Sequence, residues 1–158
     1  MKDRIHISVT SLVESVLRSG DLHSGHFVPL GPDNAVRLHR QVQASRPQEY
    51  TPEAPVAFQV ETPSLILEIC GRIDGVWRCP GRVVIEEIKT TAASLDSIEA
   101  AENPVHWGQL KTYAFLYAVR HDLKKIETQL TYVHSPSGQV KEFRRSYTRD
   151  DLQAFSMN

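Results

Sequence analysis

The chain has 158 residues, of which 41% are hydrophobic, and its formal net charge at pH 7 is −1. This length suits one domain with a real core, so a single domain over residues 1–158 is expected. No apolar run reaches the length of a membrane span, no leader pattern opens the chain, and two cysteines cannot build a disulfide framework. These features argue against a membrane protein or a disulfide-stapled secreted protein, and they predict a reducing, cytoplasmic setting.

The small net charge hides an uneven distribution. Residues 49–103 hold ten acids against four bases, whereas residues 111–149 hold eight bases against three acids. An acidic middle followed by a basic segment suits a metal site beside a surface that contacts phosphates. Ordinary solubilising charge would give the same pattern, so both interpretations stay open.

Two helices are predicted in the first 44 residues. After a short alternating segment, residues 11–14 resemble a capping box that opens a helix ending at Gly20. A second helix is predicted over residues 35–44, and His39 lies at the edge of its apolar stripe. A histidine in this position usually packs at the rim of a core.

The residues between and after these helices are predicted to be irregular. His23 and His26 could ligate zinc together with Cys70 and Cys79, but the wide separation of the cysteines is unlike that of structural zinc sites, and a polar loop is expected instead. Residues 45–64 contain four prolines and are predicted to form a connector, with at most a short strand over residues 56–60.

The most informative stretch follows this connector. Alternation predicts a strand over residues 65–73 that delivers Asp74 at its end. A Pro-Gly turn signal within residues 78–82 then leads into a second strand over residues 83–90, so the two strands are expected to form an antiparallel hairpin.

Period two places Glu87 and Lys89 on one face of the second strand and Glu86 on the other. Alternating charges more often mark a solvated face. Here, however, a run of valine and isoleucine precedes them and predicts a mostly buried strand, in which charges are costly unless they are paired or bound to metal. Asp74, Glu87 and Lys89 together would supply what metal-assisted phosphodiester cleavage needs, while Glu86 should face away and meet solvent or an arginine.

The C-terminal third is predicted to contain a helix and a second hairpin. Residues 91–102 form a loop or short helix near the site, and Asn103-Pro104 starts a helix that runs to about residue 120. Gln109 and Tyr113 are four residues apart and therefore share one face of this helix. Either Gln109 is exposed and Tyr113 packs on the sheet, or both side chains project toward the site.

Two strands and a last helix complete the prediction. The strands are expected over residues 126–134 and 139–147, and the second carries Lys141, Arg144 and Arg145 as candidate phosphate contacts. Thr148 and Asp151 resemble a capping box for a final helix, whose short length suggests either a compact terminus or a piece of a longer protein. The succession of elements predicts an α/β fold with a mixed central β-sheet flanked by helices.

Three motifs occur in the order found in one nuclease family: residues 71–74 (Gly-Arg-Ile-Asp), residues 87–90 (Glu-Ile-Lys-Thr) and residues 109–113 (Gln-Leu-Lys-Thr-Tyr). Over roughly residues 30–135 the chain resembles the PD-(D/E)XK nuclease superfamily, and most closely its RecB-type exonucleases and the related CRISPR-associated exonucleases. The resemblance implies a restriction-endonuclease-like core and a metal-dependent deoxyribonuclease.

The resemblance also implies roles for individual residues. Asp74 and Glu87 would bind Mg²⁺ or Mn²⁺, with the carbonyl of Ile88 and the ring of His39 as further ligands. Lys89 would position or help deprotonate the attacking water, and Gln109 and Tyr113 would contact DNA or orient catalytic groups. Relatives with an iron–sulfur cluster have cysteines in places where this chain has none, so no cluster is expected.

The expected substrate is DNA with single-stranded or flapped ends, cleaved as an exonuclease. A helicase module in the same chain or another chain is a further expected partner. A non-catalytic DNA-binding module or a helicase-docking domain of the same fold is the alternative.

Overall fold

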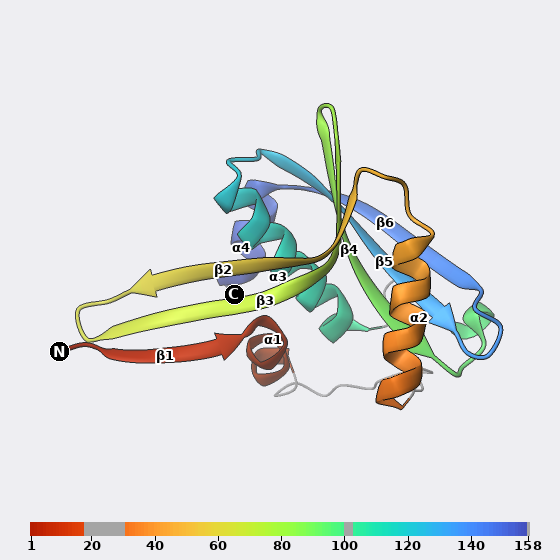
Figure 1. Cartoon of the computed structure of the whole chain (residues 1–158). Coiled ribbons are helices and arrows are strands. Elements are labelled where there is room, and N and C mark those ends of the chain that lie inside the picture. Colours follow the sequence, from red (N-terminus) through yellow and green to blue (C-terminus); the bar gives the residue numbers. More distant parts are fainter. Residues whose placement is uncertain (18–30, 100–102, 158) are drawn as a thin grey trace.

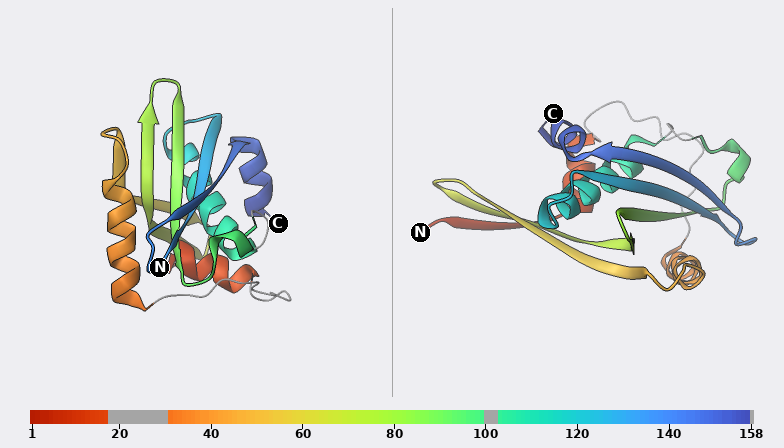
Figure 2. Two further views of the ribbon diagram at one scale, coloured as in Figure 1. Left: turned by 90° about the vertical axis from the view of Figure 1, so that its right-hand side faces the viewer. Right: turned by 90° about the horizontal axis from the view of Figure 1, so that it is seen from above.

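The computed structural model describes residues 1–17, 31–99 and 103–157. Over these ranges the chain forms a six-stranded mixed sheet with α2 on one face and α1, α3 and α4 on the other (Figures 1 and 2). The elements in chain order are β1 (Asp3–Ser8), α1 (Val9–Leu17), α2 (Pro32–Ala44), β2 (Tyr50–Glu61), β3 (Leu65–Cys79), β4 (Arg82–Thr91), a 3₁₀ turn (Leu95–Ser97), α3 (Pro104–Arg120), β5 (Lys125–His134), β6 (Val140–Thr148) and α4 (Arg149–Met157). The predicted α/β class with a mixed central sheet is confirmed.

The long strand β3 organises the sheet. β2 pairs antiparallel along one of its edges. On the other edge, β1 pairs parallel as far as Cys70, and β4 pairs antiparallel from Gly75 onward. Within the described residues, the stretch of this edge between Cys70 and Gly75 has no strand partner. The sheet therefore divides there into two parts.

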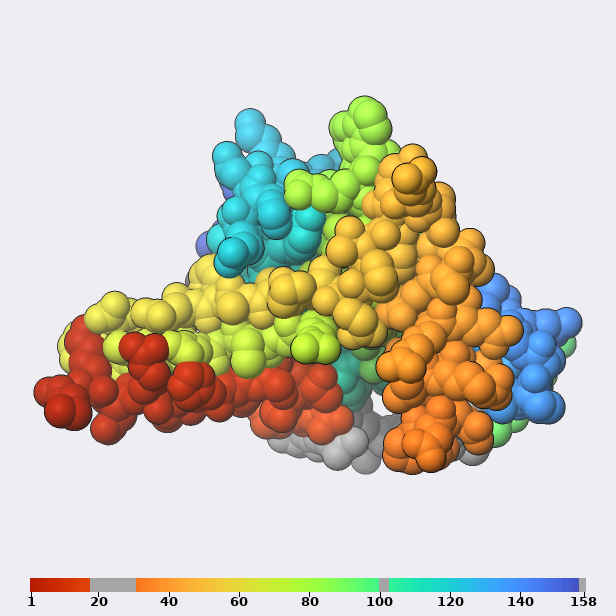
Figure 3. Space-filling model, viewed as in Figure 1, coloured from red at the N-terminus to blue at the C-terminus, as the bar shows by residue number. Residues whose placement is uncertain are grey.

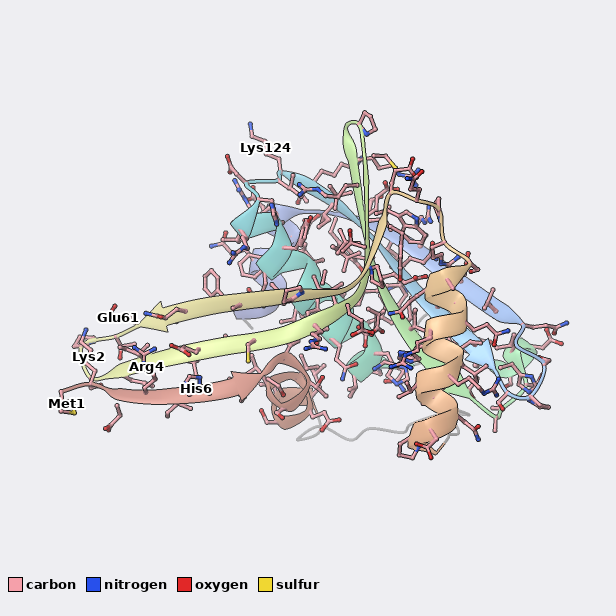
Figure 4. All side chains as sticks on the ribbon, in the orientation of Figure 1. Met1, Lys2, Arg4, His6, Glu61 and Lys124 are labelled. Carbon is pink, nitrogen blue, oxygen red and sulfur yellow. The ribbon has the colours of Figure 1, made fainter. Side chains whose placement is uncertain are left out.

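One part is an arm made of β1, β2 and the first half of β3, which projects from the body of the molecule (Figure 1). Ion pairs join its strands near the far end, where Lys2 Nζ lies 2.5 Å from Glu61 Oε1 and Arg4 pairs with Glu68 (Figure 4). The other part is the body, in which β4 leaves β3 after Glu86 and continues parallel to β5, with β6 at the outer edge.

Three local predictions differ from the structure. Residues 50–61 form a full strand rather than a connector, because β2 is an edge strand, where proline is tolerated. β3 does not end at Asp74 but continues to Cys79. Helix α1 begins at Val9, and the hydroxyl of Ser8 caps it by accepting a hydrogen bond from the Ser11 N–H at 3.0 Å.

The main core lies between the sheet and α3. Helix α3 begins as predicted, with Asn103 Oδ1 accepting a hydrogen bond from the His106 N–H at 3.1 Å and Pro104 in the first turn. Its small residues Ala114 and Ala118 are fully buried, so the helix packs closely against the sheet. This close packing brings Gln109 over the end of β4.

The remaining helices cover the two faces. The predicted capping box of α4 is present, with reciprocal hydrogen bonds of 3.2 Å and 3.1 Å between Thr148 and Asp151. A smaller core beneath α2 joins Leu38 and Val42 to Ile88 and Val133. No helix in the described ranges is long and apolar enough to cross a membrane.

Candidate active site

The candidate site lies at the point where β4 separates from β3. Gly75 pairs with Glu86, so the next position along the register places Asp74 opposite Glu87. Glu87 shares a face of β4 with Ile85 and Lys89, which is the face that α3 covers. Instead of a further pair of backbone hydrogen bonds, Asp74 Oδ2 accepts one from the Ile88 N–H at 2.7 Å. The carboxylate thus occupies the opening between the strands.

The Ile88 carbonyl belongs to the same opening. In a strand, the N–H and C=O of one residue point to the same neighbouring strand. Because the Ile88 N–H points to Asp74, its carbonyl oxygen is also on the side of β4 from which β3 has departed. The oxygen that the resemblance suggested as a ligand therefore lies on the side of the carboxylates.

Lys89 joins Glu87 to helix α3. Its Nζ lies 3.0 Å from Glu87 Oε1 and donates a hydrogen bond to Gln109 Oε1 at 2.5 Å. Gln109 is buried, which decides against an exposed position on α3. The ammonium group is consequently held beside the two carboxylates by partners on both sides.

Glu87 carries an unusual oxygen. Its side chain is nearly buried, and among the described residues its Oε2 is a buried side-chain oxygen with no hydrogen-bond partner. Such an atom costs free energy unless a cation or water meets it. A hard cation within reach of this oxygen would remove that cost.

Electrostatics support the same conclusion. Burial, followed by the negative charge of Glu87, raises the pKa of Asp74 well above its usual range, although the Ile88 N–H and Lys89 oppose the shift. No group of three or more His, Cys, Asp and Glu side chains in the described ranges is already gathered as a metal-binding cluster. Two converging carboxylates with an unsatisfied oxygen nevertheless fit a hard divalent cation such as Mg²⁺ or Mn²⁺, which favours oxygen ligands.

His39 approaches this site from the other side of the opening. Its Nδ1 lies 3.8 Å from Asp74 Oδ1, which is too far for a hydrogen bond. Burial lowers the pKa of His39, so its imidazole is neutral at physiological pH. A neutral ring next to Asp74 is suited to metal coordination.

Tyr113 of α3 packs against β3 close to the site. The residue is buried, and a Cβ on Gly71 would come within 2.8 Å of its hydroxyl oxygen, so only glycine allows this approach. Burial, and next the charge of Glu87, raises the pKa of the phenol above its ordinary value. Tyr113 is therefore a neutral group that supports the base of the site.

Glu86, on the opposite face, has entirely different surroundings. It is fully buried and accepts hydrogen bonds from Arg46 at 2.6 Å, Tyr50 at 2.8 Å, Thr131 at 2.6 Å and Gln129 at 2.9 Å. The expectation that Glu86 faces away and meets an arginine agrees with this arrangement. Adjacent glutamates therefore serve different purposes, one satisfied within the fold and one with an unsatisfied oxygen.

The candidate phosphate contacts on β6 have internal partners. Lys141 donates to the carbonyls of Leu95 and Ile98, Arg144 donates to Gln129, and Arg145 stacks on Trp107. These contacts indicate structural roles for the three side chains. The basic C-terminal segment is therefore not a free phosphate-binding surface as a whole.

The zinc alternative gains no support. His23 and His26 lie outside the described residues, and Cys70 and Cys79 are free, exposed thiols. Three residues near the site were missed by sequence reasoning, namely Gln43, Tyr50 and His106. His106 bonds Tyr132, and burial with the nearby Lys89 lowers its pKa to about 3. Only the spacing of His106, three residues before Gln109 on α3, could have suggested its position.

Comparisons with known proteins bear on the family and the fold of the chain. A family model of the PD-(D/E)XK nuclease superfamily matches residues 12–156. The crystal structure of SSO0001 is similar in fold, with a TM-score of 0.61 and 18% sequence identity, over 99% of this chain and 76% of that chain. Rai1 from Scheffersomyces stipitis matches at a TM-score of 0.29 and 13% identity, over 66% of this chain and 26% of that one, which is too low to support an argument.

No curated protein matches the chain. The family model nevertheless covers nearly the whole sequence and includes the strands that bring Asp74, Glu87 and Lys89 together. With this match, the chain belongs to the PD-(D/E)XK nuclease superfamily.

Proposed function

We propose that the protein is a Mg²⁺- or Mn²⁺-dependent deoxyribonuclease that hydrolyses phosphodiester bonds, acting as an exonuclease on single-stranded ends or flaps. The superfamily consists mostly of hydrolytic nucleases that use divalent metals. The observation that carries the proposal for this chain is the buried Glu87 oxygen without a partner, opposite Asp74 and beside Lys89.

Asp74 and Glu87 would hold the divalent cation, with the Ile88 carbonyl and His39 as additional ligands. When bound, such a cation polarises the scissile phosphate and lowers the pKa of a coordinated water. Because burial and the charge of Glu87 raise the pKa of Asp74, a bound cation would favour the ionised form of this carboxyl group.

Lys89 supplies a positive charge toward the reacting phosphate. Its bonds to Glu87 and Gln109 hold the ammonium group in one position, so little reorganisation is needed as negative charge develops. Gln109 acts through Lys89, and Tyr113 supports the base of the site. In the overall reaction, water forms one P–O bond and the P–O bond to a sugar oxygen breaks.

The approach to the site supports a nucleic-acid substrate. The surface is indented between the arm and α2, next to the region where β3 and β4 separate (Figure 3). Arg72 is exposed and lies two residues before Asp74, about 7 Å along the strand. We assign Arg72 a contact with the sugar–phosphate backbone beside the scissile bond.

The finer assignments rest on the resemblance to RecB-type exonucleases. That resemblance supports single-stranded or flapped DNA as the substrate and a helicase module as a partner. The free, exposed Cys70 and Cys79 are consistent with the proposed cytoplasmic location, where thiols stay reduced.

End-labelled single-stranded, duplex and flapped DNA test the proposal directly. Wild type should shorten the single-stranded and flapped substrates from an end with Mg²⁺ or Mn²⁺, and EDTA should abolish the reaction. Glu87→Ala serves as the inactive control and should not cleave, because it removes the unsatisfied oxygen. Binding of these DNAs without cleavage under any metal would instead support the non-catalytic DNA-binding module.

A further inference from the structure

The main-chain carbonyl of Asp74 is held in an unusual way. Glu53 stands opposite Asp74 in the register between β2 and β3, but its φ of 53° interrupts the backbone pairing at that position. The Asp74 carbonyl oxygen therefore accepts its hydrogen bond from a side chain, namely Gln43 Nε2 at 2.8 Å.

Both hydrogens of the Gln43 amide group have acceptors. A glutamine NH₂ group has two hydrogens, and the second donates to Glu53 Oε1 at 2.9 Å. The hydroxyl of Tyr50 lies 3.3 Å from the same Asp74 oxygen, but its shorter hydrogen bond goes to Glu86 at 2.8 Å. Gln43 is consequently the principal donor to the Asp74 carbonyl oxygen, and its two hydrogen bonds connect α2 to both β2 and β3.

Gln43 and His39 belong to one face of α2. They are four residues apart, one turn of the helix, and both reach Asp74. His39 faces the carboxylate at 3.8 Å, while Gln43 bonds the carbonyl of the same residue. Helix α2 thus meets Asp74 at two places, with Gln43 at its carbonyl and His39 near its carboxylate.

We propose that Gln43 is a positioning residue for the metal site, which acts by fixing Asp74 and His39 relative to each other. This inference rests on the proposed function, since it assumes that Asp74 binds a divalent cation. Groups that orient metal ligands in this way contribute roughly 10- to 100-fold to metal affinity or activity, because they hold each ligand in its productive orientation.

The test compares two substitutions on the same helix. Gln43→Met keeps the length of the side chain but removes both donors, and Gln41→Met makes the same change at an exposed position whose side chain does not reach Asp74. Calorimetric titration with Mn²⁺ should show affinity falling about tenfold or more for Gln43→Met, and staying near wild type for Gln41→Met. The melting temperatures in EDTA should be similar, because Gln43 is only half-buried.

A second measurement needs no metal. The Ile88 N–H donates to Asp74 Oδ2, so its hydrogen exchange reports where the carboxylate lies. In EDTA, Gln43→Met should exchange this amide faster than both Gln41→Met and wild type.

Unchanged Mn²⁺ affinity in Gln43→Met, or an equal loss in Gln41→Met, overturns the positioning role. If wild type binds no Mn²⁺, the proposed function fails instead, and Ile88 exchange still decides whether Gln43 positions Asp74.

Discussion

Glu86 and Glu87 are adjacent buried glutamates, and the structure predicts opposite consequences for removing them. Glu86→Ala would leave the Arg46 guanidinium and the donors of Tyr50, Gln129 and Thr131 without their shared acceptor. Breaking a buried ion pair by removing one partner costs about 3–5 kcal/mol. For a domain of this size, each kcal/mol corresponds to roughly 2–4 °C, so the melting temperature should fall by about 6–20 °C.

Glu87→Ala should behave differently in the absence of metal. It removes an oxygen that has no partner and relieves the repulsion of Asp74, while Lys89 keeps its hydrogen bond to Gln109. These gains oppose the lost ion pair of 3.0 Å with Lys89 and the small cavity that is left. The free energy of unfolding should therefore stay within about 1 kcal/mol of wild type.

Urea and thermal unfolding in EDTA at neutral pH measure both effects, with circular dichroism to confirm that each variant is folded. Added Mn²⁺ should then raise the melting temperature of wild type but not that of Glu87→Ala, because only a folded state with the site intact binds the ion. Equal destabilisation by the two substitutions, or a larger loss in Glu87→Ala, would refute the assignment of the two faces of β4.

Further outcomes are expected at four other positions. Lys89→Met should retain Mn²⁺ binding, yet cleave end-labelled DNA roughly 10²- to 10⁴-fold more slowly, and equal rates would remove Lys89 from catalysis. His39→Ala should weaken Mn²⁺ binding more than it lowers the melting temperature, and unchanged calorimetric affinity would make His39 a rim residue. The raised pKa of Asp74 favours the folded state while the group is protonated, a contribution complete below about pH 4 and lost as pH rises through the folded pKa. Metal-free wild type should thus lose stability relative to Asp74→Asn as pH rises from 4 to 8. If the melting temperatures of the two proteins change in parallel with pH, the raised pKa of Asp74 is contradicted. Arg72→Ala, assayed in Ca²⁺ or EDTA, should weaken DNA binding and reduce the slope of log affinity against log salt by about 1, whereas an unchanged slope would exclude a phosphate contact.

Local patterns in the sequence determined the class of fold and most of its elements. The start of α3 at Asn103-Pro104, the capping box of α4 and the β3–β4 hairpin follow from residues that are close together in the chain. Period two was sufficient to separate Glu86 from Glu87 and Lys89, because a strand alternates its faces whatever its partners are.

The strand β2 was missed for a reason that is equally physical. Its prolines argue against a strand in isolation, and only its position at the edge of the sheet makes them acceptable. In the same way, the basic residues of β6 resemble a phosphate-binding surface until the structure gives Lys141, Arg144 and Arg145 partners inside the fold.

The candidate site shows most clearly which features follow from the sequence and which depend on the tertiary structure. Asp74, Glu87 and Lys89 could be chosen from the sequence because their types and spacing match the chemistry. Their surroundings could not, since Gln43 and Tyr50 lie 31 and 24 residues from Asp74 and follow no local pattern. Which glutamate oxygen lacks a partner, and which side chain holds the Asp74 carbonyl, depend on contacts between distant segments, and such contacts exist only once the chain has folded.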